Sequence, residues 1–218
     1  MKQKAVFIIS AVLLLLAFVA GTLFYKDQQE KAASQKAEAN RALLSRMHSP
    51  TFGSPSAPVV IVEFLDPACE TCGAFYPRVK KMMAEHPDWI RLVLRHAPFH
   101  SGADNVVAAL EAARRQGKFW PALEILLANQ SDWARNHTAS IERAWIYFER
   151  VGLNMEQLAL DMRSPEIANV ITQDLADAKA LNVTMTPEYF VNGKPLPSFG
   201  FEQLKELVDQ ALADTRGR

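Results

Sequence analysis

The hydrophobic pattern of the chain opens with a long apolar run that shows no alternation. Residues 5–25 contain no charged side chain, and one Ser, one Gly and one Thr are the only interruptions. These 21 residues have about the length that a helix needs to cross a bilayer. Lys2 and Lys4 precede the run, and acidic and basic residues follow it together. The positive-inside rule therefore predicts a cytoplasmic N-terminus and places residues 26–218 outside the cytoplasm.

A cleaved signal peptide is the alternative interpretation of residues 1–25. Signal peptides have a shorter apolar stretch, about 7–15 residues, followed by small residues at the cleavage site. Bulky Phe18 stands at the critical spacing before Ala20, although Val19 and Gly21 offer a passable site. We favour an uncleaved membrane anchor, and both interpretations predict export of the rest of the chain.

Residues 26–50 have the composition of a helix-prone linker. They are rich in Ala, Gln, Lys and Glu and carry few large apolar side chains, so a helix here would have little to bury. A stalk of about 22 helical residues would hold a domain roughly 33 Å from the bilayer. Pro and Gly residues between positions 50 and 58 then break the helical pattern. A compact domain is predicted over residues 51–218.

Strand and helix patterns follow one another in this domain. A β-branched run at 59–65 predicts a strand, helical spacing follows it, and residues 90–97 read as a second strand. Strand, helix and strand in this order indicate a parallel pair with a right-handed crossover. Residues 103–182 are helical in pattern, before a short strand at 188–191 and an amphipathic helix at 201–212. We therefore predict an α/β domain with a long helical insertion.

Composition and charge exclude two classes of protein. The chain is 49% hydrophobic and 22% charged, which supports a buried core and excludes disorder as the dominant state. Lys+Arg and Asp+Glu both number 24, and no basic run marks a phosphate-binding face. Nucleic acid is therefore not an expected partner.

The two cysteines carry the candidate chemistry. Cys69 and Cys72 lie one helical turn apart, where the first predicted strand gives way to a helix, so their sulfurs can bond to each other. The thiolate is the species that attacks a disulfide, and the free N–H groups and dipole at a helix start stabilise a thiolate on Cys69. Cys72, one turn further in, fits the resolving thiol. We predict a redox-active dithiol that needs no other cofactor.

A structural disulfide and a metal site are the alternatives for this pair. A bridge across so short a loop would restrain the unfolded chain only a little. Structural zinc takes four ligands, and the sequence has no second cysteine pair. His96 and His100 are four residues apart, but Pro98 opposes the helix that would align them. We expect both to be surface or capping histidines, and we expect no metal site.

Three features occur along the chain in a fixed order. They are Val-Glu-Phe-Leu-Asp-Pro-Ala-Cys-Glu-Thr-Cys at 62–72, the helical block, and Val-Thr-Met-Thr-Pro-Glu-Tyr-Phe-Val-Asn-Gly at 183–193. Together they resemble the thioredoxin superfamily, specifically its DsbA-like exported branch, over about residues 52–215. The resemblance implies a thioredoxin fold, a membrane-anchored thiol–disulfide oxidoreductase, and substrate proteins with thiols or disulfides as partners. It further implies a single-pass protein of the bacterial inner membrane, with its domain facing the periplasm or cell exterior and a membrane redox partner recycling the dithiol.

The resemblance also implies roles for residues near the dithiol. The family proline that matches Pro187 has a cis peptide bond, and the residue before it, here Thr186, presents its backbone to an extended peptide. Glu63 stands six residues before Cys69 and matches the family's buried acid, which relays the proton of the resolving thiol. Strand alternation by itself also allows an outward-pointing Glu63.

The dipeptide inside the motif departs from the family. Glu70 and Thr71 stand where the best-known member of the branch has Pro-His, and the negative charge of Glu70 should oppose the thiolate and make the disulfide less oxidising. Oxidation, reduction and isomerisation therefore all remain open. The alternative function is a thioredoxin-like module that holds a partner protein or Cu(I) without turnover, with Cys69 and Cys72 as soft ligands.

Overall fold

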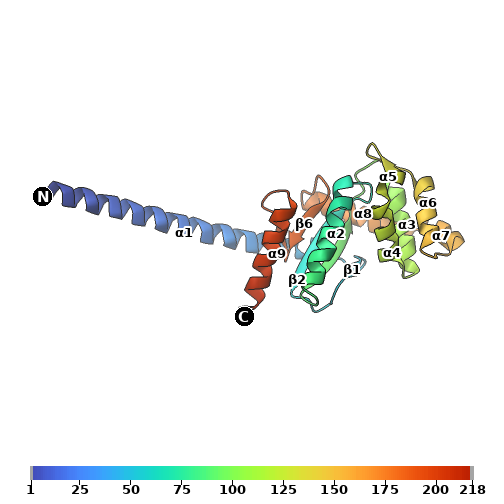
Figure 1. Cartoon of the computed structure of the whole chain (residues 1–218), viewed down its shortest axis with the longest axis horizontal. Coiled ribbons are helices and arrows are strands. Elements are labelled where there is room, and N and C mark those ends of the chain that lie inside the picture. Colours follow the sequence, from blue (N-terminus) through green and yellow to red (C-terminus); the bar gives the residue numbers. More distant parts are fainter. Residues whose placement is uncertain (1, 217–218) are drawn as a thin grey trace.

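A single long helix precedes a compact domain in the computed structural model. The backbone is described for residues 2–216, and the side chains of that range are described except at 2–12, 30, 33–34, 36–39 and 216. The long helix, α1 (Lys2–Leu44), has 43 residues and a length of roughly 65 Å at about 1.5 Å per residue. Figure 1 shows α1 projecting away from the domain.

The predicted membrane anchor, residues 5–25, lies within α1. Its residues 5–12 fall outside the part of the chain whose side chains are described. Further along, large apolar side chains between Leu13 and Tyr25 are exposed to solvent. Among the residues that are described, no helix combines the length and the apolar character that crossing a membrane requires.

A five-stranded sheet forms the centre of the domain. Its strands are β1 (Thr51–Phe52), β2 (Val59–Leu65), β3 (Ile90–His96), β6 (Glu188–Val191) and β7 (Lys194–Pro195), in the order β1-β3-β2-β6-β7. β2 and β3 run parallel, as the strand–helix–strand pattern predicted. β6 pairs antiparallel with β2 on its other side. The strand that leads to the cysteines is therefore the central strand of the sheet.

The helices fall into those that cover the sheet and those that form a separate block. The first kind are α2 (Glu70–Glu85), α8 (Pro165–Ala180) and α9 (Phe201–Arg216). The block contains α3 (Ala103–Arg115), α4 (Phe119–Ala128), α5 (Gln130–Trp133), α6 (Ile141–Arg150) and α7 (Met155–Asp161), with the hairpin strands β4 (Ala134–Arg135) and β5 (Thr138–Ala139) after α5. Figure 1 shows the block at the end of the molecule opposite α1. The polypeptide between β3 and β6 is thus mainly helical, as expected.

Polar residues fix where the later helices of this region begin. Ser140, Asn154 and Ser164 precede α6, α7 and α8, and each side chain accepts a hydrogen bond from a backbone N–H three residues further on. Such caps satisfy donors that the first helical turn leaves unpaired. The local sequence therefore sets the helix boundaries in this part of the fold.

Both faces of β2 are buried, which is typical of a parallel strand covered by helices on both sides. Ile61 belongs to the main core cluster with Val79 of α2. Phe64 belongs to a second cluster with Ala178 of α8. Because side chains alternate along a strand, Glu63 shares the face of Ile61 and points towards α2.

A buried ion network ties the end of the long helix to the domain. Arg95 of β3 is completely buried, and its Nη2 lies 2.7 Å from Asp174 Oδ1 and 2.6 Å from Asp177 Oδ2 of α8. Arg46 and His48, just after α1, bind the same two carboxylates. Burial alone would raise the pKa of Asp174, but the hydrogen bond with His48 and the charge of Arg95 lower it to about 2. Removing one partner of a fully buried pair such as Arg95 and Asp174 typically costs about 3–5 kcal/mol. Arg46 and His48 join the chain after α1 to this buried pair.

The expectation that both histidines near β3 lie at the surface is wrong for His96. This side chain is completely buried, and its Nε2 lies 2.9 Å from Glu111 Oε1 of α3. Glu111 is in turn paired with Arg114. His96 belongs to the core because β3 is covered on both faces, and the acid on α3 supplies its polar partner.

Candidate active site

The two cysteines lie where β2 ends and α2 begins. Cys69 is the N-cap residue of α2 and is 6% exposed, whereas Cys72, in the first turn, is fully buried. The turn before the helix is fixed by Asp66, whose carboxylate accepts a hydrogen bond from the N–H of Ala68 at 2.8 Å. The chain thereby presents Cys69 at the helix end where backbone N–H groups have no helical partner.

The environment separates the pKa values of the two thiols. A hydrogen bond from Cys72 lowers the pKa of Cys69, and burial opposes this effect. A hydrogen bond with the Thr186 side chain and the backbone N–H groups of Cys72 and Thr71 add to the lowering, so the value falls to about 5. Burial raises the pKa of Cys72 well above its usual range, and its hydrogen bond to Cys69 raises it further. Of the two thiols, Cys69 is therefore the one that ionises more readily, whereas Cys72 holds its proton more strongly.

A loop before β6 faces the nucleophile. The peptide bond between Thr186 and Pro187 is cis, as the resemblance implied. The Sγ of Cys69 lies 3.2 Å from the carbonyl oxygen of Thr186, to which it donates a hydrogen bond when it is protonated. The backbone of Thr186 is thus in direct contact with the reactive sulfur, although the two residues are 117 positions apart in sequence.

Glu63 is buried beneath the dithiol, and its side chain points inward. The side chain is 0% exposed, its Oε1 accepts a hydrogen bond from the hydroxyl of Tyr189 at 2.9 Å, and its Oε2 has no hydrogen-bond partner among the described residues. Burial raises the pKa of Glu63 to about 8; the hydrogen bond from Tyr189 opposes this shift, and the charge of Cys69 adds to it. A carboxyl group with such a pKa can accept and return a proton near neutral pH.

Two contributors to the site were missed by the sequence analysis. The side-chain amide of Gln130, on α5, donates hydrogen bonds to the carbonyl oxygens of Pro67 and Cys69, at 2.7 and 2.9 Å. Tyr189, paired across the sheet with Glu63, supplies the hydroxyl that binds the acid. Tyr189 could be identified as the partner of Glu63 only if the register of β6 against β2 were known. Nothing in the sequence around Gln130 indicates its contact with the loop before α2.

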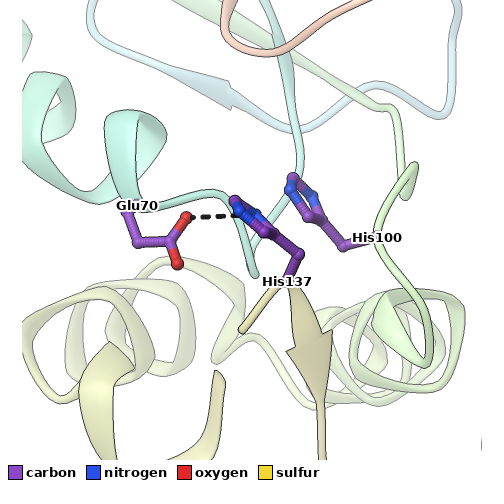
Figure 2. A group of neighbouring side chains, drawn as sticks. All are labelled: Glu70, His100 and His137. Atoms are coloured by element: carbon purple, nitrogen blue, oxygen red, sulfur yellow. Dashed lines mark ion pairs between the residues drawn. The ribbon is translucent and has the colours of Figure 1, made fainter. Parts of the chain in front are cut away.

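The two residues between the cysteines differ in environment. Thr71 is half-buried, and its backbone N–H is directed at the Cys69 sulfur. The Glu70 side chain is exposed and its Oε2 lies 3.7 Å from Nδ1 of His137, in the turn between β4 and β5. Figure 2 shows Glu70 and His137 facing each other, with His100 beside them. Glu70 thus lies beside two histidines from other segments of the chain, an arrangement that no local sequence pattern indicates.

An apolar surface is exposed close to the cis-proline loop and α2. Met185, next to Thr186 in the chain, is 57% exposed, and Phe199 is 51% exposed. The ring of Phe199 stacks on Phe75 of α2 with 5.6 Å between the ring centroids. The ring of Phe199 and the side chain of Met185 thus offer apolar surface to solvent on the side of the cis-proline loop and α2.

The order of the strands, the dithiol at the start of α2 and the cis-proline loop against it define a thioredoxin-like protein. The chain belongs to the thioredoxin family, which matches its residues 45–210. This match begins at the residues that attach α1 to the sheet and ends within α9.

Individual relatives agree with the fold. A thioredoxin-like oxidoreductase from Silicibacter pomeroyi is 32% identical, and the match covers 78% of this chain and 95% of that one with a TM-score of 0.68. BdbD from Bacillus subtilis has the same fold at 22% identity, with the same coverage and TM-score. The Na(+)/H(+) antiporter NhaA 3 of Salinispora tropica is 33% identical over 170 residues, which are 76% of this chain and 25% of that protein. The chain thus spans a quarter or less of the curated relatives that it matches here.

Proposed function

We propose that this protein is an extracytoplasmic thiol–disulfide oxidoreductase that exchanges disulfides with substrate proteins through Cys69 and Cys72. The observation that carries the proposal is the contact of the Cys69 sulfur with the backbone of Thr186, 3.2 Å away. This contact places the Cys69 sulfur, whose pKa is low, next to the backbone of Thr186, which can pair with an extended peptide. The 32% identical thioredoxin-like oxidoreductase supports the same class of chemistry.

The first step is an attack by the Cys69 thiolate on a disulfide of the substrate. A new bond forms between Cys69 and one substrate sulfur, while the substrate disulfide breaks and the other sulfur leaves as a thiolate. The substrate backbone lies against Thr186, and the exposed apolar side chains of Met185 and Phe199 contact its neighbouring residues. The product of this step is a mixed disulfide between two proteins.

The second step releases the substrate. Cys72 transfers its proton to the carboxylate of Glu63 and attacks the sulfur of Cys69, which forms the Cys69–Cys72 disulfide and frees the second substrate sulfur as a thiolate. The substrate has then gained two electrons and the dithiol has lost two. The same residues operate in reverse to oxidise a substrate, so the reduction potential and the recycling partner set the direction.

Replacing Cys72 with serine tests this function. The full-length variant should accumulate mixed disulfides with many extracytoplasmic proteins, because it can complete the first step but cannot resolve the product. The adducts should disappear on addition of a reductant and should be absent from the Cys69→Ser, Cys72→Ser double variant. The wild-type chain should also catalyse the reduction of insulin. A wild-type chain that binds Cu(I), traps no protein as Cys72→Ser and has no insulin activity would instead be a metal-binding module.

We also propose that residues 5–25 anchor the protein in the bacterial inner membrane with its domain on the periplasmic or outer side, where a membrane redox partner recycles the dithiol. The uncharged run of residues 5–25 and the two lysines before it support this orientation. The full-length protein should sediment with membranes and resist extraction at high salt. In intact spheroplasts, Cys69 should react with a membrane-impermeant maleimide. A protein found in the soluble fraction at full length, or labelled only after lysis, would refute this placement.

A further inference from the structure

Three side chains of the types that bind metal ions converge beside the dithiol, from three segments that are distant in sequence. Glu70 is the first residue of α2, His100 follows β3, and His137 lies in the turn between β4 and β5. One ligand atom of each lies within 4.8 Å of the others, and Figure 2 shows the carboxylate and the two imidazole rings side by side. We propose that Glu70, His100 and His137 bind a divalent transition-metal ion, with Zn²⁺ as the ion that the set fits.

A buried carboxylate prepares His100 as a ligand. The Nδ1 of His100 lies 2.7 Å from Oδ2 of Asp66, and the Asp66 side chain is 0% exposed. When Nδ1–H donates to this carboxylate, the lone pair of the ring remains on Nε2. Histidines that bind metals usually have such a partner on the other nitrogen, because it fixes both the tautomer and the ring orientation. Asp66 also accepts the backbone N–H of His100 at 2.8 Å, so the whole residue is held in place.

The hairpin that carries His137 is fastened beside His100. The backbone N–H of Ala139 donates to the carbonyl oxygen of Ser101 at 2.8 Å. Gly102 has a φ of +75°, and a Cβ at this position would lie 2.5 Å from the carbonyl oxygen of Ala139. The absence of a side chain at Gly102 therefore allows the close approach of the hairpin. This contact places the imidazole rings of His100 and His137 in a stack with 5.2 Å between the centroids.

The distances between the three ligand atoms are slightly longer than those of a zinc site, so the side chains would move closer together when an ion binds. Zn²⁺ bonds to His nitrogen and carboxylate oxygen at about 2.0–2.2 Å, so two ligand atoms of a tetrahedral site lie roughly 3.4 Å apart. Glu70 Oε2 and His137 Nδ1 are already 3.7 Å apart. Both of these side chains are more than half exposed and can adjust, whereas His100 is held by Asp66. Two imidazoles and one carboxylate favour Zn²⁺ over the oxygen-seeking Mg²⁺ and Ca²⁺.

The proposed site does not share ligands with the dithiol, so it can be tested independently of the proposed function. The full-length chain, without a histidine tag, is oxidised so that Cys69 and Cys72 form a disulfide and cannot bind metal. It is then freed of metal with EDTA, dialysed and titrated with Zn²⁺ by calorimetry. We expect one ion to bind per chain. The ring-proton NMR signals of His100 and His137 should shift on addition of Zn²⁺.

Two single variants and a matched control make the test specific. Glu70→Gln removes a ligand with little change in size, and His137→Asn retains a residue that tolerates the φ of +57° at this position. Each should weaken Zn²⁺ binding at least about 10-fold, the loss typical even of an outer partner of a metal ligand. His86→Asn, which alters a half-buried histidine at the end of α2, should bind as the wild type does.

Defined results would overturn the proposal. The site is refuted if the oxidised wild-type chain binds no Zn²⁺, or if Glu70→Gln and His137→Asn both bind it with wild-type affinity. A shift of the His86 signals in place of those of His100 and His137 would equally refute it. Because the cysteines are oxidised throughout, none of these outcomes bears on disulfide exchange.

Discussion

At pH 6, iodoacetamide should alkylate Cys69 of the reduced protein about 10-fold faster than it alkylates free cysteine, and should leave Cys72 unmodified. With a pKa of about 5, Cys69 is mostly thiolate at this pH, whereas a thiol of pKa about 8.5 is roughly 0.3% thiolate. The thiolate fraction of Cys69 is therefore roughly 300-fold larger than that of free cysteine. Because a less basic sulfur is also a weaker nucleophile, the expected gain in alkylation rate is only about 10-fold. Mass spectrometry of tryptic peptides after short reaction times measures both rates.

The difference in alkylation rate between Cys69 and Cys72 should be larger than the difference between Cys69 and free cysteine. Cys72 is fully buried and its pKa is raised well above the usual range, so we expect Cys69 to react at least about 100-fold faster at pH 6. EDTA is present throughout, so that no cation lies at Glu70. The Cys69→Ser variant, which keeps Cys72, is the control and should remain unmodified. Equal labelling of both cysteines, or a Cys69 that reacts only above pH 8, would contradict the assignment of the nucleophile.

The low pKa of Cys69 also bears on the direction of electron flow. A stabilised thiolate favours the reduced form and makes the disulfide more oxidising. The sequence led us to expect that the negative charge of Glu70 would weaken this effect, and the Glu70 side chain is exposed, with its Oε2 3.7 Å from Nδ1 of His137. The pKa is lowered chiefly by the Cys72 thiol, with help from backbone N–H groups at the helix start. The motif dipeptide is therefore only one of several influences on the potential.

The sequence predicted the elements that depend on local pattern. Residues 59–65 are rich in β-branched side chains and residues 90–97 in aliphatic ones, and the strands β2 and β3 occupy nearly the same residues. The change from strand pattern to helical spacing likewise placed the two cysteines at the start of a helix. Each of these features is encoded within a short window, so a reading of the sequence alone can recover it.

Features that depend on contacts between distant segments were not predictable in this way. The inward direction of Glu63 could not be read from alternation, because β2 is buried on both faces and its pattern does not distinguish them. Gln130 reaches the active-site loop across 61 positions of sequence. The grouping of Glu70, His100 and His137 exists only because a hairpin of the helical block packs against the loop after β3. Contacts of this kind between distant segments become visible only in the tertiary structure.

Replacing Glu63 with glutamine should slow the release of the mixed disulfide by roughly 100-fold or more, the usual contribution of a positioned proton acceptor. Cys72 is fully buried, and the charge of the equally buried Glu63 acts directly on its thiol. The first step should be unaffected, because Cys69 is already ionised at neutral pH. Stopped-flow measurement of both steps with a fluorescent disulfide peptide separates the two rates. If the variant slowed both steps equally, Glu63 would have a structural role.

The pH dependence of stability provides an independent check on Glu63. Its pKa is about 8 in the folded protein against 4.5 for an ordinary glutamate, so between these values the folded state holds a proton that the unfolded state has lost. Relative to Glu63→Gln, the wild type should therefore lose about 2 kcal/mol of stability between pH 6 and 8. Cys69 acts in the opposite direction over this range, because its thiol is ionised in the folded state and protonated in the unfolded chain, but this contribution is common to both proteins and cancels in the comparison. Urea unfolding of the reduced proteins at both pH values measures the effect.

Tyr189→Phe distinguishes burial from hydrogen bonding as the cause of the raised pKa. The hydroxyl of Tyr189 donates to Glu63 Oε1 at 2.9 Å and lowers the pKa of the acid against the larger effect of burial. Without this hydrogen bond the carboxyl should titrate at a still higher pH, which carbon NMR of the labelled side chain can follow. Release of the mixed disulfide should then require more alkaline conditions, since fewer molecules would hold Glu63 as a carboxylate at pH 7. An unchanged or lower titration midpoint would mean that the carboxyl group is hydrated, and that burial is not what holds its proton.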